Sequence, residues 1–396
     1  MGRFRATLFS GGMFALNVNG YICGRKAAGI RPAKPLKTLL RLAFLSLVLL
    51  LAGTLPAHGH GPEAPAAHGD AEAAEFNAGQ LIMGHVVDDH SWHIAGDFAI
   101  PLPVIIYDTQ RGLQMFSSGR FEHGHAAYNG YMLHDGKIVA VDAAGNVDEA
   151  ASANIWDISI TKNTLAIFMV VALMLVVFIS VAGSYKARTG MAPKGLQSLL
   201  EPIILFVRDD VAKSSIGPEY ARFMPFLLTQ FFLILFANLL GLVPVFPGGA
   251  NVTGSIAVTF TLALFTFVVV TFNGNKHYWH HILAMPGVPA WVLIILTPVE
   301  ILGMFLKPFV LMIRLFANIT GGHIIVMSFF SLIFVFGVSS PVAGYGVSIV
   351  SVAFTIFMNL LEMLVAFIQA YVFTFLTALY LGAAVEQSHE HKESLV

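Results

Sequence analysis

The sequence predicts an all-α polytopic membrane protein that crosses the bilayer about five times. It is 56% hydrophobic and 11% charged, whereas about 25% of the residues in an ordinary soluble domain are charged. Between Phe223 and Val385 only five formal charges occur, at Lys276, Glu300, Lys307, Arg314 and Glu362. A segment so poor in charge cannot form a water-soluble domain. The net charge of −1 and the absence of a basic block argue against nucleic acid as a partner.

Five apolar regions are expected to form the transmembrane helices of a membrane domain at 158–385. They cover 160–183, 223–245, 256–272, 288–336 and 342–381. The last two would each exceed about 60 Å at 1.5 Å per residue, whereas the hydrocarbon core is about 30 Å thick. We therefore expect them to bend or to form a long tilted hairpin, with its polar side facing protein or water.

Lysine and arginine in short loops predict the orientation of the chain. The loop SYKARTGMAPK, after the first apolar region, carries three of them, which places it in the cytoplasm. Five crossings then leave the tail, 386–396, in the cytoplasm as well. Before the second region, GLQSLLEPIILFVRDDVAK is apolar on one side and is expected to break at Pro202. It predicts an amphipathic helix at the cytoplasmic interface, the alternative being a short soluble-type helix packed on the bundle.

The N-terminal part predicts export. Basic residues precede the apolar run Leu42–Leu55, which is short for a span and is followed by PAHGHG. Residues 1–57 are therefore interpreted as a signal peptide with an N-terminal extension, the alternative being an uncleaved anchor. A His/Ala/Gly-rich linker follows at 58–75. Residues 76–157 are expected to form a small, β-rich, outward-facing accessory domain, because FAIPLPVIIY and KIVAVD are strand-like and turn signals separate them.

This exported region is rich in possible metal ligands. The stretch GHVVDDHSWHI contains His85, Asp88, Asp89, His90 and His93, and such side chains can bind zinc or another transition metal. Their spacing matches no specific site, so neither a metal nor a cofactor is predicted. A lid or a docking element for a partner subunit is the favoured interpretation. The single cysteine, at position 23, excludes a disulfide framework.

The polar residues of the membrane domain follow a helical pattern. Glu300, Lys307 and Arg314 are seven residues apart and share one stripe, with Asn318 one turn further. In the fifth region, Glu362 and Gln369 are again seven apart.

These residues also pair by depth in a hairpin. Matching Arg314 with Gln369 and His323 with Glu362 places the turn within 339–344, where SSPVAG supplies proline and glycine. An ideal helix turns His323 away from Arg314, so either the adjacent glycines kink the helix or the His–Glu pair lines a cavity to one side. A permanent cation with two titratable groups at a different depth is typical of a proton inlet with an electrostatic barrier. The alternatives are that the arginine only pins helices together and that His323 is structural.

Two stretches carry a family resemblance. LKPFVLMIRLFANITGGHIIV and LLEMLVAFIQAYVFTFLTALYL resemble the a subunit of the membrane sector of F-type ATP synthases, through R-L-F-x-N and Q-A-Y-V-F-T-x-L-T. FFLILFANLLGLVPVF is similar to the helix that precedes them in that family. The resemblance covers about 160–385 and leaves out the exported region.

The resemblance implies a non-catalytic stator subunit of the bacterial inner membrane. Such a subunit conducts protons through two half-channels to and from a rotating ring of c subunits, and assembles with the b subunits of the peripheral stalk and the remaining ATP synthase subunits. Arg314 would face the ring carboxylate, and His323 and Glu362 would belong to the inlet half-channel. Some members carry this acid and histidine in the reverse order. The other matching polar positions are Asn318 and Gln369 beside the arginine, and Glu300 and Lys307 toward the cytoplasm.

Two other classes of membrane protein fit the sequence less well. An ion-coupled secondary transporter would favour inverted repeats, and no convincing repeat is found. An intramembrane enzyme is disfavoured because neither H-E-x-x-H nor G-x-S-x-G occurs.

Overall fold

A computed structural model describes most of the chain from residue 88 onward. The described residues are 16–17, 21–22, 79, 88–95, 98–124, 126–134, 136–142, 145–189, 191–243, 248–285, 287–339 and 341–386. Apart from the two-residue strands β1 (Leu16–Asn17) and β2 (Tyr21–Ile22), the predicted signal and linker lie outside them. Residues 387–396 of the predicted tail also lie outside.

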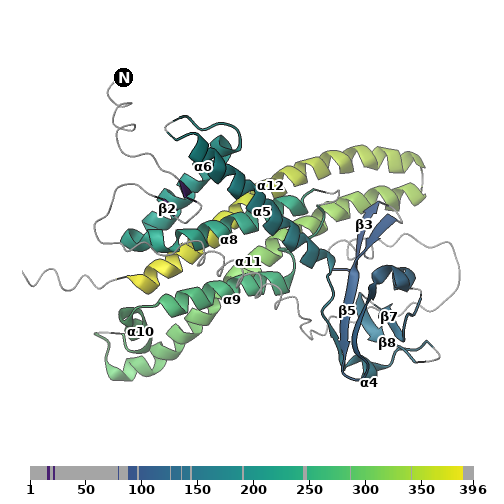
Figure 1. The fold of residues 1–396 in the computed structure, drawn as a ribbon, viewed down its shortest axis with the longest axis horizontal. Helices are drawn as coiled ribbons and strands as arrows, with labels where there is room; N and C mark the ends of the chain where they lie inside the picture. Colours follow the sequence, from purple (N-terminus) through teal and green to yellow (C-terminus); the bar gives the residue numbers. More distant parts are fainter. Residues whose placement is uncertain are drawn as a thin grey trace, which may run out of the picture.

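The described part of the chain is mostly helical (Figure 1). Five of its helical segments are long and apolar enough to cross a membrane, which confirms the polytopic prediction. The long helices are α5 (Lys162–Ala187), α8 (Tyr220–Gly241), α9 (Ile256–Asn273), α11 (Ala290–Ser339) and α12 (Pro341–Val385). A short helix, α10 (Lys276–Leu283), precedes α11.

The segment between α5 and α8 is more continuous than the sequence suggests. Helix α6 (Leu196–Phe206) passes through Pro202 and continues into a π-helix, Val207–Lys213. The predicted break at Pro202 is therefore wrong. Proline removes one backbone donor, but burial of Leu200 and Ile204 in the core holds the helix on both sides of it. Two short turns, α7 (Ser214–Ile216) and a 3-10 turn at Gly217–Glu219, lead into α8.

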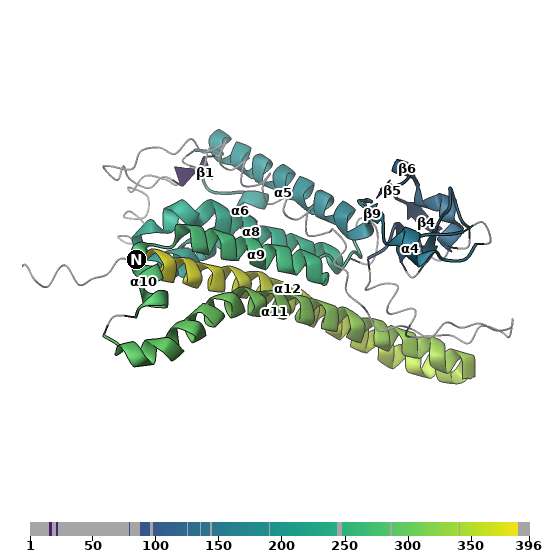
Figure 2. The ribbon, with the colours of Figure 1, turned by 90° about the horizontal axis from the view of Figure 1, so that it is seen from below.

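Helices α11 and α12 form the expected antiparallel hairpin. They lie side by side over most of their length in Figure 2, and α11 bends along its course. The turn falls between Ser339 and Pro341, inside the predicted interval. Near it, a Cβ at Gly344 would lie 2.8 Å from the Cα of Gly337, so the two backbones touch. Pro298 and Pro308 lie inside α11, and prolines of this kind account for bends in long helices.

Residues 91–157 form short antiparallel strands around their own core. The three sheets are β3–β4, β6–β5–β9 and β7–β8, and the core contains Val104, Ile106, Phe121, Tyr131 and Ile138. The strands are β3 (Ser91–Ala95), β4 (Phe98–Pro101), β5 (Pro103–Asp108), β6 (Gly112–Ser117), β7 (Tyr131–His134), β8 (Lys137–Ala140) and β9 (Ile155–Asp157). A 3-10 helix, Ser118–Gly124, and α4 (Glu149–Ser152) connect them.

This strand region is fastened to the first turn of α5. The backbone N–H of Lys162 donates to the carbonyl of Asp89 at 2.9 Å, and that of Asn163 donates to the Asp88 carboxylate at 2.9 Å. Free N–H groups at a helix start need such acceptors. Trp92 is 2% exposed and belongs to the same hydrophobic cluster as residues of α5 and α8. The strand region is therefore held in one place on the helices.

An ion pair locks the two ends of the strand region together. His90 Nε2 lies 2.9 Å from Asp157 Oδ2, across 67 residues of sequence. Burial disfavours the charged imidazole, but the hydrogen bond and the nearby carboxylates outweigh it and raise the pKa of His90. Burial likewise opposes the charge on Asp157, and the hydrogen bond from His90 prevails and lowers the pKa of Asp157.

The stability that this pair contributes depends on pH in two directions. The His90 contribution is fully present below the ordinary imidazole value of 6.5 and is lost as the pH rises through the raised pKa. The Asp157 contribution is present above 3.8 and is lost as the pH falls through the lowered pKa.

We expect hydrogen exchange of the β9 amides, corrected for the intrinsic rate, to quicken from about pH 6 to about pH 9 as His90 loses its proton. The variant His90→Asn keeps a donor toward Asp157 but does not titrate, so its β9 protection should not change over this range. Exchange mass spectrometry of the peptides that cover 155–163 measures both proteins. The same pH dependence in the variant would contradict this role of the pair.

Candidate functional site

The structure brings His323 of α11 and Glu362 of α12 into contact. His323 Nδ1 lies 3.9 Å from Glu362 Oε2, and both side chains are largely buried. The distance lies at the outer limit of an ion pair. This agrees with the depth matching drawn from the turn position. An imidazole and a carboxylate at this distance can pass on a proton through one bridging water or after a small approach.

A glycine allows this contact. A Cβ at Gly322 would overlap the Glu362 carboxylate, whereas a Cβ at its neighbour Gly321 would meet nothing within 4 Å. The carboxylate of one helix therefore occupies the space that a side chain on the other would fill. Gly322 thus permits a close approach of the hairpin helices, and α11 remains helical across both glycines.

The C-terminal end of α8 lies beside His323, and the loop at 248–255 contacts α11 one turn away. The position that a Cβ at Gly241 would take lies 3.8 Å from His323 Nε2, and the Thr320 hydroxyl donates to the carbonyl of Gly254 at 3.2 Å. The pair therefore faces the end of α8 and the loop at 248–255.

A buried asparagine fixes this loop. The side-chain amide of Asn238 in α8 donates to the carbonyl of Ala366 in α12 at 3.3 Å. Its side-chain oxygen accepts from the Thr253 hydroxyl at 2.5 Å. One side chain thus joins α8, the loop and α12 one turn beyond Glu362.

No fixed partner of Arg314 lies among the residues that the structure describes. Within the described residues, no carboxylate lies within ion-pair distance of Arg314 and no hydrogen bond reaches its guanidinium. Its side chain is half-buried on α11, next to the exposed Ile313 and one turn from the exposed Val310 on the same side of the helix. The cation therefore lies at the edge of an exposed apolar face of the hairpin. Such faces mark contact with lipid or with another protein.

The remaining predicted residues lie on either side of Arg314. Gln369 is buried in α12, and Asn318 is exposed one turn further along α11. Within the described part of the chain, no hydrogen bond joins Arg314 to either of them. The predicted equal depth of Arg314 and Gln369 therefore involves no hydrogen bond between the two side chains.

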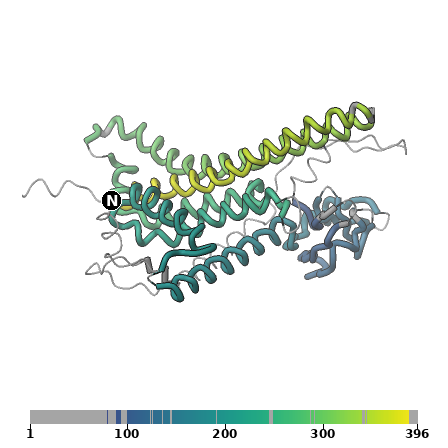
Figure 3. Tube along the Cα trace, turned by 90° about the horizontal axis from the view of Figure 1, so that it is seen from above, coloured from purple at the N-terminus to yellow at the C-terminus, as the bar shows by residue number. Residues whose placement is uncertain are grey.

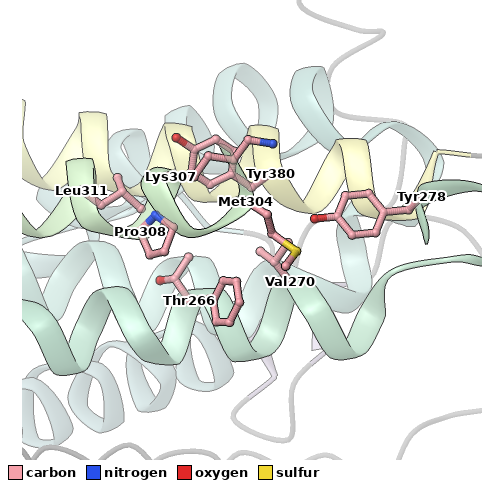
Figure 4. A pocket seen from close by; sticks show the side chains of 9 residues that line it. Thr266, Val270, Tyr278, Met304, Lys307, Pro308, Leu311 and Tyr380 are labelled. Atoms are coloured by element: carbon pink, nitrogen blue, oxygen red, sulfur yellow. The ribbon is translucent and has the colours of Figure 1, made fainter. Parts of the chain in front are cut away.

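Lys307 and Tyr380 meet at the other end of the stripe. The Lys307 ammonium lies 5.5 Å from the centre of the Tyr380 ring, a cation–π distance. Both line a small cavity with Thr266, Met304 and Leu311, which has room for about one water molecule (Figure 4). Glu300 is half-buried two turns away on α11 and does not line this cavity.

The membrane domain is similar in sequence to known proteins. The family model described as ATP synthase A chain matches residues 164–382. The ATP synthase subunit a 2 of Chlorobaculum tepidum is 40% identical over 85% of this chain and 80% of its own. The ATP synthase subunit a of Chlorobium phaeobacteroides (strain DSM 266) is 35% identical over 96% and 92% of the two chains. That of Myxococcus xanthus is 43% identical over 60% and 76%.

The chain belongs to the ATP synthase A chain family. A second model, described as Domain of unknown function (DUF8433), matches residues 81–158. The matched ATP synthase A chain region contains Arg314, His323, Glu362 and every other residue singled out in the membrane domain. The strand region belongs to the second match.

The candidate metal ligands of the exported region all lie within this second match, at 81–158. Within the described residues no three side chains of histidine, cysteine, aspartate or glutamate form a group that could hold a metal ion. His85 and the side chain of His93 lie outside the described residues. His90 instead pairs with Asp157.

Sequence reasoning missed the residues that position the site. Asn238 was not singled out, although an asparagine inside the apolar run of α8 is a signal in its own right. Gly322 was considered only as a possible kink. Tyr380 gave no signal, because a tyrosine in a transmembrane helix is common.

Replacing Asn238 by Ala should destabilise the protein by about 1–2 kcal/mol, because one hydrogen bond to α12 and one to the loop at 248–255 are lost. Thr229→Ala is the matched control, since the Thr229 hydroxyl bonds only to the carbonyl of Pro225 within α8. Thermal unfolding of the detergent-solubilised protein measures both. Equal shifts of the unfolding midpoint in the two variants would show that the hydrogen bonds of Asn238 do not stabilise the contact between α8, the loop and α12.

Proposed function

We propose that this chain is the stator subunit that conducts protons to and from a rotating ring of c subunits in an ATP synthase. Protons would pass through two half-channels, and their flow would drive ATP synthesis. The chain itself would form no catalytic site. The observation that carries the proposal is the guanidinium of Arg314, which has no partner in the described chain and lies at an exposed apolar face.

Arg314 needs a counter-charge from outside the chain. Placing an arginine at mid-membrane costs roughly 2.5–3.5 kcal/mol on insertion scales. A carboxylate at 4 Å contributes about 4 kcal/mol at an effective dielectric of 20. A deprotonated ring carboxylate that passes the hairpin would supply it. The pairing must be transient for the ring to turn, and water in the half-channels would keep it weak.

His323 and Glu362 would form the inlet. Nine residues separate His323 from Arg314, which is about 13 Å along a helix. A proton could reach the His–Glu pair through the loop after α8 and pass from there to the ring. The permanent charge of Arg314 would block a direct path to the opposite side. Asn318 and Gln369 would be polar neighbours of the arginine.

Lys307 and Glu300 would belong to the outlet. Lys307 lies seven residues from Arg314 in the opposite direction, about 10 Å along α11. Its contact with Tyr380 and the adjacent cavity supply polar groups and room for water on that side. The two half-channels would then meet only through the ring.

The orientation follows from the charged loops. We infer a multi-pass protein of the bacterial inner membrane with the strand region at 76–157 outside and the tail at 386–396 in the cytoplasm. Helix α6 and its π-helical continuation would lie at the cytoplasmic interface. The chain would assemble with the c ring, the b subunits and the remaining ATP synthase subunits. Residues 1–57 would direct export, and 58–75 would be a linker.

Arg314→Ala should reduce ATP-driven proton pumping at least about 100-fold, because the ring carboxylate loses a counter-charge of about 4 kcal/mol. Arg222→Ala, at the exposed start of α8 where the guanidinium bonds to Asn273, should pump normally. Quenching of a pH-sensitive dye in inverted vesicles measures both, with equal amounts of assembled complex. Normal pumping by Arg314→Ala would refute the proposal.

Gly322→Ala should slow proton-driven ATP synthesis roughly tenfold. Its methyl group would displace the Glu362 carboxylate, and overpacking of this kind costs about 1–3 kcal/mol. Gly321→Ala raises helix propensity by the same amount but meets open space, so it should leave the rate near normal. Reconstituted liposomes with an imposed proton gradient provide the assay. Equal rates of ATP synthesis in the two variants would show that protons do not pass by way of the His323–Glu362 contact.

A further inference from the structure

The sheet β6–β5–β9 has one apolar face outside its core. Val104 and Ile106 of β5 point inward and are fully buried. The outward positions on the three strands are exposed. Tyr107, Leu113, Met115 and Trp156 are exposed by 48%, 59%, 66% and 59%.

These four side chains form a continuous surface, which we name the Trp156 face. Tyr107 pairs with Leu113 on one side and with Trp156 on the other, and Met115 pairs with Ile105. Directly paired residues of antiparallel strands lie on the same face. No outward position of these strands carries a charge. A contiguous apolar surface of this kind marks a binding site.

The Trp156 face lies close to the start of a membrane-spanning helix. Only five residues separate Trp156 from Lys162, where α5 begins, so an extended chain bridges at most about 20 Å. Between them Ile158 is also exposed. Because Asp88, Asp89 and Trp92 hold the strand region on the helices, the distance cannot grow by a swing of the domain.

The face also lies on the periphery of the molecule. Figure 2 shows β5, β6 and β9 beside the N-terminal end of α5 and away from the α11–α12 hairpin. The same arrangement appears from the other side in Figure 3. Along α5, residues such as Leu175, Val176 and Ile179 are exposed and apolar, as on a helix that faces lipid. The strands that carry the face therefore lie at the start of α5 and apart from the hairpin that carries Arg314.

We propose that the Trp156 face rests on the lipid headgroup layer of the membrane beside α5. Tryptophan and tyrosine are enriched at this depth, because their rings are apolar and their N–H and O–H groups stay hydrated. Leu113 and Met115 then insert among the upper acyl chains. The contact extends the lipid-facing surface of α5 onto the strand region, and it requires only that α5 crosses the membrane.

The test measures the depth of this face in the complete ATP synthase, reconstituted into lipid nanodiscs. Met115→Cys carries an environment-sensitive fluorophore, in a chain whose single cysteine is removed by Cys23→Ser. Lys137→Cys is the control, an exposed position on the β7–β8 hairpin. Each label is quenched first by phospholipids with a nitroxide near the headgroup and then by aqueous iodide.

Stronger lipid quenching and weaker iodide quenching at 115 than at 137 is the expected result. Equal quenching at the two positions would overturn the proposal, because the face would then be in water. Protection of position 115 from both quenchers would overturn it too, because a protein subunit would then cover the face. Met115→Cys lies on the exposed side of its sheet, so normal assembly of the labelled complex is expected and is checked by its ATP hydrolysis.

Discussion

The proposed mechanism depends on one constraint, that a permanent positive charge on an apolar surface needs a counter-charge that can leave again. Arg314 keeps its charge at every relevant pH, and the described chain offers it no carboxylate. A fixed internal partner would have satisfied the charge and left nothing for a moving group. The hairpin instead carries Arg314 beside exposed apolar side chains such as Val310 and Ile313. The attraction of a visiting carboxylate is then comparable to the cost of the site itself, about 4 against roughly 3 kcal/mol.

Close backbone packing makes the rest of the site possible. Gly322 leaves the space that the Glu362 carboxylate occupies, and this brings it to His323. Asn238 binds the loop after α8 through Thr253 and also reaches the backbone of α12. Unsatisfied polar groups are costly in an apolar bundle, so these bonds limit where the loop can lie. His323 and Glu362 are therefore held together at a different depth of the hairpin from Arg314.

Sequence reasoning predicted the large elements because membrane insertion demands simple patterns. Long apolar runs identified the five helices, and the equal-depth pairing of His323 with Glu362 agreed with a turn that Pro341 marks independently. It failed where tertiary packing decides the outcome. Pro202 does not break α6, because buried neighbours on both sides compensate for one lost bond. No local pattern joins His90 to Asp157 across 67 residues, and the role of Gly322 depends on a side chain of another helix.

The two parts of the molecule meet at the first turn of α5, so the strand region cannot move independently of the helix on which it is fastened. In the proposed assembly, a ring of c subunits stands against the hairpin and completes the membrane part. A density map of the intact assembly tests this account most directly. It should place the Arg314 guanidinium opposite the carboxylate of a ring subunit, with no fixed partner from its own chain. A guanidinium among lipid headgroups, or bonded to an acid of a static subunit, would contradict it.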